Sequence, residues 1–239
     1  MIMAEFKKVI FFFFTTLLLA HDSPYSLDKF KPVLEISKLQ APKSSFNPLY
    51  SRKYGDFADY SNKYFYLQDR KYMVFYMCGN HNRSELRFKN IWKVGTENKK
   101  EMEAEVKLFP LDEKKEFTFL QIHADSTLKN MPTINKPLLR VVWYKKLKGK
   151  RSHIWAIIRL GDDIFSRYQK IDLGVMPKSF FDVKISVYKN VLKIFVNGVE
   201  KVNMDVGYWG KYYNYFKAGV YLQDDGCAKV LFKKLTVKD

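Results

Sequence analysis

The chain has 239 residues, of which 47% are hydrophobic and 17% aromatic; this composition excludes wholesale disorder and suits one domain with a large core. Its 42 lysines and arginines outnumber 25 aspartates and glutamates, which gives a formal charge of +17. The positive electrostatic potential of such a chain favours a polyanionic partner, which could be nucleic acid, an anionic membrane or an acidic polysaccharide. Charge alone does not distinguish among these partners.

The N-terminus has the layout of a secretory signal peptide. Lys7 and Lys8 precede an apolar run at residues 9–19, and the small residue Ala20 follows. We therefore expect residues 1–20 to be a signal peptide and the protein to be secreted, or periplasmic in a bacterium; the alternative is an uncleaved anchor. The run is short for a membrane span, so we expect no stable membrane association after cleavage. Export also disfavours nucleic acid as the partner.

Residues 21–49 differ in composition from the rest of the chain. They are polar and contain Pro24, Pro32, Pro42 and Pro48. Because proline interrupts regular backbone hydrogen bonding, this spacing predicts an extended N-terminal arm lying over the domain, not a helix.

From residue 50 to residue 239 the pattern is that of short strands separated by turns. Asn197 and Gly198 predict a tight hairpin, and a basic loop is expected at 145–151. The sequence therefore predicts an all-β domain at 50–239, an antiparallel β-sandwich or jelly roll with a concave substrate-binding sheet. The expected strands are 64–68, 71–77, 83–89, 101–109, 117–123, 138–144, 154–160, 181–188, 191–196, 215–223 and 229–237.

The strand expected at 215–223 has one apolar face and one polar face. Alternate side chains of a strand point to opposite sides, so Tyr215, Lys217, Tyr221 and Gln223 share a face around Gly219. Core packing does not require this set of groups, and the glycine leaves room for a flat ligand to approach the backbone. We interpret this face as the floor of a binding cleft.

Two further strands carry polar groups on one face. Arg83, Glu85 and Arg87 share a face, as do Gln121 and His123. Arginine can bind a carboxylate through two parallel hydrogen bonds. Taken singly, the first set is also typical of a surface ion-pair ladder, and a lone histidine is more often structural. Three strands with convergent polar faces favour one shared groove.

The segments Arg-Ser-Glu-Leu-Arg (83–87), Gln-Ile-His (121–123) and Tyr-Phe-Lys-Ala-Gly-Val-Tyr-Leu-Gln (215–223) resemble, in order and spacing, the signature strands of the alginate lyases of polysaccharide lyase family seven. The resemblance extends from about residue 50 to the C-terminus. One departure is Leu222, where the family usually carries Asn, and its side chain should point away from the groove. The resemblance implies a β-jelly roll that cleaves a polyuronate such as alginate by β-elimination.

The resemblance also implies a role for each residue of the three segments. The C5 proton of a uronate is weakly acidic, so Arg83 and Gln121 would bind and neutralise the carboxylate on which charge develops. Tyr221 could protonate the departing C4 oxygen, and either Tyr221 or His123 could remove the C5 proton, according to the face of the sugar. The residues expected to bind substrate and hold the groove are Glu85, Arg87, Lys217, Gln223 and Tyr215.

Three alternatives stay open. A non-catalytic carbohydrate-binding jelly roll would explain the aromatic residues and the charge. It would not explain why Arg83, Gln121, His123 and Tyr221 are all present together. A nucleic-acid binder would use the basic loop, which is more often a solvated hairpin tip. A lyase of the same type could act on another polyuronate such as glucuronan. We expect a monomer, no cofactor and no metal, since the sequence has only four histidines and no metal-ligand cluster.

Cys78 and Cys227 are the only cysteines, and in an exported protein they are a candidate disulfide. Paired residues of an antiparallel ladder keep a constant sum of numbers. If Arg83 lies opposite Tyr221, that sum differs by one residue from the sum for the two cysteines. We therefore expect a bridge at one end of this strand pair, with two buried free thiols as the alternative.

Overall fold

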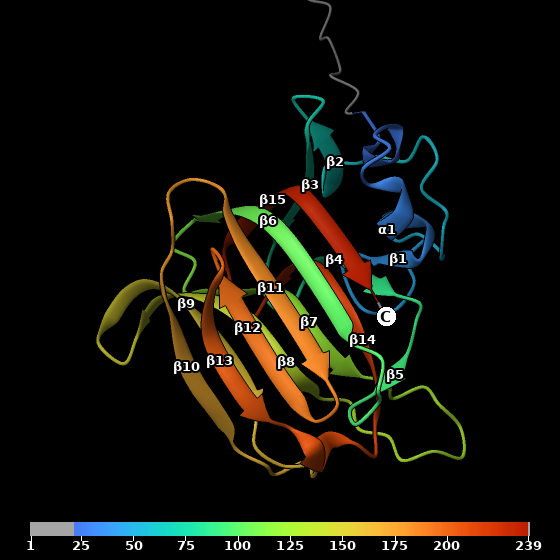
Figure 1. Ribbon diagram of the computed structural model, residues 1–239. Coiled ribbons are helices and arrows are strands. Elements are labelled where there is room, and N and C mark those ends of the chain that lie inside the picture. The colour runs from blue at the N-terminus through green and yellow to red at the C-terminus, as the bar shows by residue number, and fades with distance from the viewer. Residues whose placement is uncertain (1–21, 239) are drawn as a thin grey trace, which may run out of the picture.

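The computed structural model describes residues 22–238, which form a sandwich of two antiparallel β-sheets with a short helical segment beside β1 (Figure 1). The expected fold class is thus confirmed. The first sheet contains, in spatial order, β1 (Ser37–Gln40), β4 (Arg83–Phe88), β14 (Tyr213–Leu222), β7 (Glu116–Ala124), β8 (Pro137–Leu147), β9 (Lys150–Arg159) and β10 (Tyr168–Val175), with β5 (Trp92–Lys93) also paired to β14. The second contains β13 (Val199–Asp205), β12 (Val191–Val196), β11 (Phe181–Tyr188), β6 (Lys100–Leu111), β15 (Cys227–Lys238), β3 (Tyr72–Cys78) and β2 (Phe65–Gln68).

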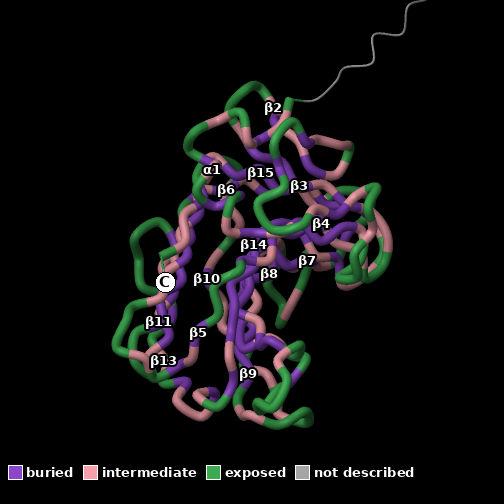
Figure 2. The backbone as a smooth tube through the Cα atoms, turned by 90° about the vertical axis from the view of Figure 1, so that its right-hand side faces the viewer, coloured by how far each residue is buried: buried purple, intermediate pink, exposed green. Residues whose placement is uncertain are grey.

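The core lies between the sheets and is built from the apolar side of each strand. Phe119 of β7 and Phe181 of β11 meet edge to face with their ring centroids 6.4 Å apart, which joins the two layers. Figure 2 shows buried segments along the strands and exposed segments in the surrounding loops. Because each strand of the first sheet uses one side for this core, its other side is free to carry polar chemistry.

Every strand expected from the sequence is present, but β1, β5, β10 and β13 were not expected. Strands β10 and β13 lie at the edges of their sheets, and each buries a single side chain, Leu173 and Val202. Their hydrophobic alternation is therefore weak. The expected loop at 145–151 is wrong: β8 and β9 extend through it, and only Lys148 and Gly149 form the turn. The hairpin at Asn197 and Gly198 is confirmed, with positive φ at both residues.

The N-terminal segment is more structured than the expected extended arm. It contains the 3₁₀ turn η1 (Pro24–Ser26), the helix α1 (Lys31–Glu35) and the strand β1. Pro32 does not prevent α1, because it lies in the first helical turn, where the N–H that proline lacks has no intrahelical partner. Strand β1 pairs with β4 and places Lys38 opposite Arg87. This segment is thus an edge of the first sheet.

A disulfide joins Cys78 and Cys227, whose Cα atoms lie 4.1 Å apart. Arg83 pairs with Tyr221 as expected. The cysteines, however, pair across β3 and β15 in the second sheet, at the corner where these strands pass into β4 and β14. The Gly79 N–H donates to the Gly226 carbonyl over 3.0 Å and closes the same corner.

The expected signal peptide at residues 1–20 lies outside the described residues. Within residues 22–238 no helix has the length and apolar character needed to cross a membrane. A short 3₁₀ turn, η2 (Gly207–Trp209), leads into β14.

Candidate active site

The outer face of the first sheet brings the three polar strand faces together on β4, β14 and β7, which are neighbours. Side chains directly opposite in an antiparallel pair share a face. The polar groups therefore form a continuous surface. The register places Tyr221 opposite Arg83, Lys217 opposite both Arg87 and Gln121, and Tyr215 opposite His123.

Glu85 lies at the centre of this surface and receives three donors. Lys217 forms an ion pair with it, Arg83 Nη1 lies 3.4 Å from Oε2, and the Gln121 amide donates to Oε1. Glu85 is 0% and Lys217 is 2% exposed. Burial by itself would raise the pKa of the Glu85 carboxyl, but Lys217 and Arg83 hold that pKa below its usual value. Burial likewise lowers the pKa of Lys217 to about 8, while Glu85 opposes this fall.

Glu85 and Lys217 therefore lie beneath the floor of the site. Both were expected to hold the groove and the substrate. Their position suits the holding of Arg83 and Gln121, both of which contact Glu85. A fixed buried carboxylate of this kind limits the orientations that its donors can adopt.

His123 is positioned as a neutral imidazole with one free ring nitrogen. Its Nδ1 lies 2.8 Å from the Ala124 carbonyl oxygen, which can only accept, so Nδ1 carries the proton and Nε2 keeps a lone pair. Burial, with the charge of Lys217, lowers the pKa of His123 from 6.5 to about 4. The Tyr215 ring stacks on the imidazole with centroids 5.6 Å apart. At neutral pH the side chain is therefore uncharged.

Tyr221 lies at the opposite end of the cluster, against two cationic or basic groups. The Arg83 guanidinium carbon is 4.3 Å from the centre of its ring. The Tyr221 hydroxyl lies 3.3 Å from Nδ1 of His81, a residue that the sequence analysis did not single out. His81 stands in the β3–β4 connection with a φ of 53°, and no strand pattern marks such a position.

Arg87 and Tyr215 form the side of the cluster nearest β1. Arg87 Nη2 donates to Asp125 Oδ2 over 2.7 Å, and its guanidinium carbon lies 4.0 Å over the Tyr215 ring. Burial raises the pKa of Tyr215 to about 12 although Arg87 opposes this. Tyr215 therefore stays a neutral phenol at neutral pH. Asp125, which directly follows β7, was also missed by the sequence analysis.

The sequence analysis explained Gly219 by the approach of a flat ligand, but the structure gives a different explanation. A Cβ at this position would lie 2.4 Å from the Ser84 carbonyl oxygen and 2.7 Å from the Glu85 Cα. Its φ of 144° is also one that residues with a side chain rarely adopt. The glycine therefore makes room for the neighbouring strand β4, not for a ligand. Leu222 is buried in the core, so its side chain points away from the site as expected.

A hollow opens over this cluster on the side facing β8 and β10. Five expected site residues line it, namely Arg83, Gln121, His123, Tyr221 and Gln223. Gln223 donates through Nε2 to Thr118, while its Oε1 is buried without a partner among the described residues. The lining residues that the sequence analysis did not identify are His81, Asn135, Lys136, Pro137, Arg140 and Tyr168. Within residues 22–238 no group of three or more His, Cys, Asp or Glu side chains could hold a metal ion.

Comparison with known proteins identifies the family of this chain. The family model described as alginate lyase matches residues 34–239. The chain belongs to the alginate lyase family. This lyase is 32% identical to an alginate lyase of Photobacterium sp. (strain ATCC 43367) over 235 residues, which cover 84% of this chain and 81% of that protein.

Solved structures of this lyase's relatives have the same architecture. The structure of alginate lyase AlyC3 has a TM-score of 0.81 and 30% identity, covering 92% of this chain and 96% of that chain. AlyC3 is also known in complex with dimannuronate, with a TM-score of 0.80 and 29% identity. Alginate lyase A1-II′, a member of polysaccharide lyase family seven, has a TM-score of 0.71 at 22% identity and shows the shared fold. The protein is therefore a polysaccharide lyase with the family's jelly roll.

Proposed function

We propose that this lyase cleaves alginate by β-elimination at the C4–O glycosidic bond and leaves unsaturated uronate ends. The observation that carries the proposal is that Arg83, Gln121, His123 and Tyr221, from three neighbouring strands, line one hollow. The dimannuronate complex of AlyC3 supports an acidic polysaccharide as the substrate.

Stabilisation of the substrate carboxylate falls to Arg83 and Gln121. Removal of the C5 proton places charge on that carboxylate, and fixed donors aimed at it lower the barrier. Arg83 keeps an Nε–H that is buried and without a partner among the described residues. Gln121 donates one amide hydrogen to Glu85 and has a second one available. Both groups are fixed from below by Glu85, so little reorganisation accompanies the reaction.

Proton transfer falls to His123 and Tyr221. The free Nε2 of neutral His123 can accept the C5 proton, and the Tyr221 hydroxyl can protonate the departing C4 oxygen. Because both groups line the same hollow, the base and the acid can act on one sugar. Where the C5 proton faces Tyr221, the Tyr221 oxygen must first pass its own proton to a neighbour such as His81; it can then accept the C5 proton and return it to the C4 oxygen. His81, at 3.3 Å from that hydroxyl, can exchange a proton with it.

The remaining expected residues support these four. Glu85 and Lys217 hold Arg83 and Gln121, and Tyr215 fixes the His123 ring by stacking. Arg87 lies against Tyr215 and extends the cationic surface toward β1. The unpartnered oxygen of Gln223 can accept a hydrogen bond from a sugar hydroxyl.

The deciding experiment is an absorbance assay for new carbon–carbon double bonds with purified protein on alginate, glucuronan and DNA. We expect product from alginate. Product from glucuronan alone would identify the other polyuronate as the substrate, and binding without product would favour the carbohydrate-binding alternative.

The Tyr221→Phe variant tests the assigned acid. It removes only the hydroxyl, so turnover on alginate should fall at least ~10²-fold, the low end of what a positioned acid or base contributes. Tyr213→Phe is the matched control, since Tyr213 on β14 contacts Lys93 and lies outside the hollow. A Tyr221→Phe protein with most of its activity would overturn the assignment.

We further propose that the protein acts as a monomer outside the cytoplasm. The disulfide supports this compartment, because such bridges persist where the surroundings are oxidising. Sequencing the N-terminus of exported protein should find His21 first. Gel filtration of the mature protein should give the mass of one chain.

A further inference from the structure

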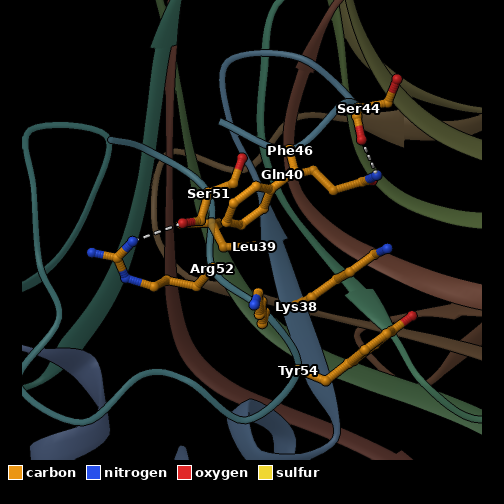
Figure 3. A pocket seen from close by; sticks show the side chains of 9 residues that line it. Lys38, Leu39, Gln40, Ser44, Phe46, Ser51, Arg52 and Tyr54 are labelled. Atoms are coloured by element: carbon orange, nitrogen blue, oxygen red, sulfur yellow. Dashed lines mark hydrogen bonds between the residues drawn. The ribbon is translucent and has the colours of Figure 1, made fainter. Parts of the chain in front are cut away.

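A second hollow lies on the other side of the catalytic cluster, over the edge strand β1 and the segment that follows it (Figure 3). We call it the β1 hollow; its lining includes Lys38, Gln40, Phe46, Lys53 and Tyr54. In Figure 3 the side chains of Lys38, Gln40 and Tyr54 extend to the same side. None of these residues belongs to the three motif strands.

The strand register connects the β1 hollow with the catalytic cluster. Lys38 lies opposite Arg87, Arg87 opposite Lys217, and Lys217 opposite Gln121. These four residues form one row across β1, β4, β14 and β7. With neighbouring strands about 4.8 Å apart, the row spans about 14 Å, enough for a linear polymer to reach both hollows.

The chemistry of the β1 hollow suits an acidic sugar. Lys38 forms no ion pair with a carboxylate of the described residues, and its ammonium lies 5.2 Å from the centre of the Tyr54 ring. Burial and Arg87 lower the pKa of this ammonium, while Asp125 opposes the fall. Because Asp125 balances the charge of Arg87, Lys38 is the cation here that is left to attract an anionic ligand. Phe46 is 58% and Tyr54 is 38% exposed, so aromatic surface is also available to the apolar side of a sugar ring.

Gln40 gives the second, independent indication of a ligand. It is only 7% exposed, and its Nε2 donates to the Ser44 carbonyl over 3.0 Å. Its Oε1 is buried without a hydrogen-bond partner among the described residues. A buried acceptor without a donor is costly, so this oxygen is poised to receive a hydroxyl group.

We propose that the β1 hollow binds a further uronate unit of the polysaccharide, with Lys38 on its carboxylate, Gln40 accepting from a hydroxyl, and Tyr54 beside the ring. This inference rests on the proposed function, because the occupant is another unit of the chain being cleaved. It makes the N-terminal segment part of the substrate groove and predicts that efficiency depends on the length of the substrate.

The test compares Lys38→Ala and Tyr54→Ala with Lys201→Ala, which removes the same charge from an exposed position on β13 in the other sheet. Kinetics are measured on size-fractionated alginate oligosaccharides and on the polymer. We expect Lys38→Ala to raise KM for long substrates about tenfold, as for loss of a hydrogen bond to a charged group. The ratio of efficiencies on long and short substrates should fall accordingly, whereas Lys201→Ala should leave it unchanged.

Three outcomes would overturn the inference: an unchanged KM for the polymer in both hollow variants, an equal rise for every substrate length, or the same rise in Lys201→Ala. Thermal melting of each variant controls for folding. If Lys38→Ala proves unstable, Tyr54→Ala still tests the inference, because it changes a half-exposed side chain. Calorimetric titration with a long alginate oligosaccharide separates the two proposals. Binding that Lys38→Ala weakens would support the β1 hollow even if no cleavage occurred, and absence of both binding and cleavage would overturn both.

Discussion

The central carboxylate Glu85 offers the sharpest test of how the site is held together. We expect Glu85→Gln to lower the free energy of unfolding at pH 7 by about 3–5 kcal/mol, the range for removing one partner of a buried ion pair. The substitution keeps the shape but removes the charge that balances Lys217 and Arg83. It also replaces one acceptor oxygen by an NH2 donor, although Lys217 and Arg83 can only donate.

An independent limit on this loss follows from Lys217. The variant can escape the unpaired buried charge by deprotonating the lysine, whose ordinary pKa is 10.5. At pH 7 that deprotonation costs about 5 kcal/mol, from 3.5 pH units at about 1.4 kcal/mol each. In the variant the unfolded state binds the extra proton, so stability rises with pH and the limit falls to about 2 kcal/mol at pH 9. The wild type also gains stability near pH 8, where its own Lys217 loses a proton, but by about half as much. The loss should therefore shrink at alkaline pH.

Guanidinium unfolding followed by tryptophan fluorescence at pH 7 and pH 9 measures these quantities. Glu103→Gln is the matched control, because Glu103 pairs with Lys234 at the surface and its loss should cost less than about 1 kcal/mol. The double variant Glu85→Gln/Lys217→Met should recover most of the stability, since no unpaired charge remains. The reasoning is refuted if Glu85→Gln loses no more than the control, or if its loss is the same at both pH values.

Three further expectations concern His123, the disulfide and Gly219. The pKa of His123 is lowered to about 4 in the folded protein, so on acidification the unfolded state binds a proton at this histidine before the folded state does. The free energy of unfolding of the wild type should therefore fall by up to about 3 kcal/mol from pH 6.5 to pH 4. A His123→Gln protein should lack this contribution to the pH dependence. An identical pH dependence in both proteins would contradict it. Alkylation of denatured, unreduced protein should add no mass, whereas two alkyl groups would mean free thiols; replacing Cys78 and Cys227 by serine should cost about 2–5 kcal/mol on denaturant unfolding. Gly219→Ala should cost at least about 2 kcal/mol, because its Cβ meets the Ser84 carbonyl at 2.4 Å; a smaller change in the same measurement would show that β4 can move away.

The sequence by itself determined which residues share a face of a strand. Alternation is local, so the polar face of Tyr215, Lys217 and Tyr221 and the inward side chain of Leu222 follow from residue order alone. The same locality gave the strands that bury several side chains and the hairpin at Asn197 and Gly198. Edge strands such as β10 gave no comparable signal, because they bury too little apolar surface.

Only the tertiary structure decided which strands are neighbours and how deeply each polar group lies. Residue order does not reveal that Glu85 and Lys217 form a buried pair beneath the site, or that Gly219 gives space to β4. Nor does it bring His81 to Tyr221, Asp125 to Arg87, or β1 to the edge of the groove. These contacts join residues far apart in the chain, and burial depends on everything packed around a group. Both are therefore set by the closed sandwich and not by any segment of it.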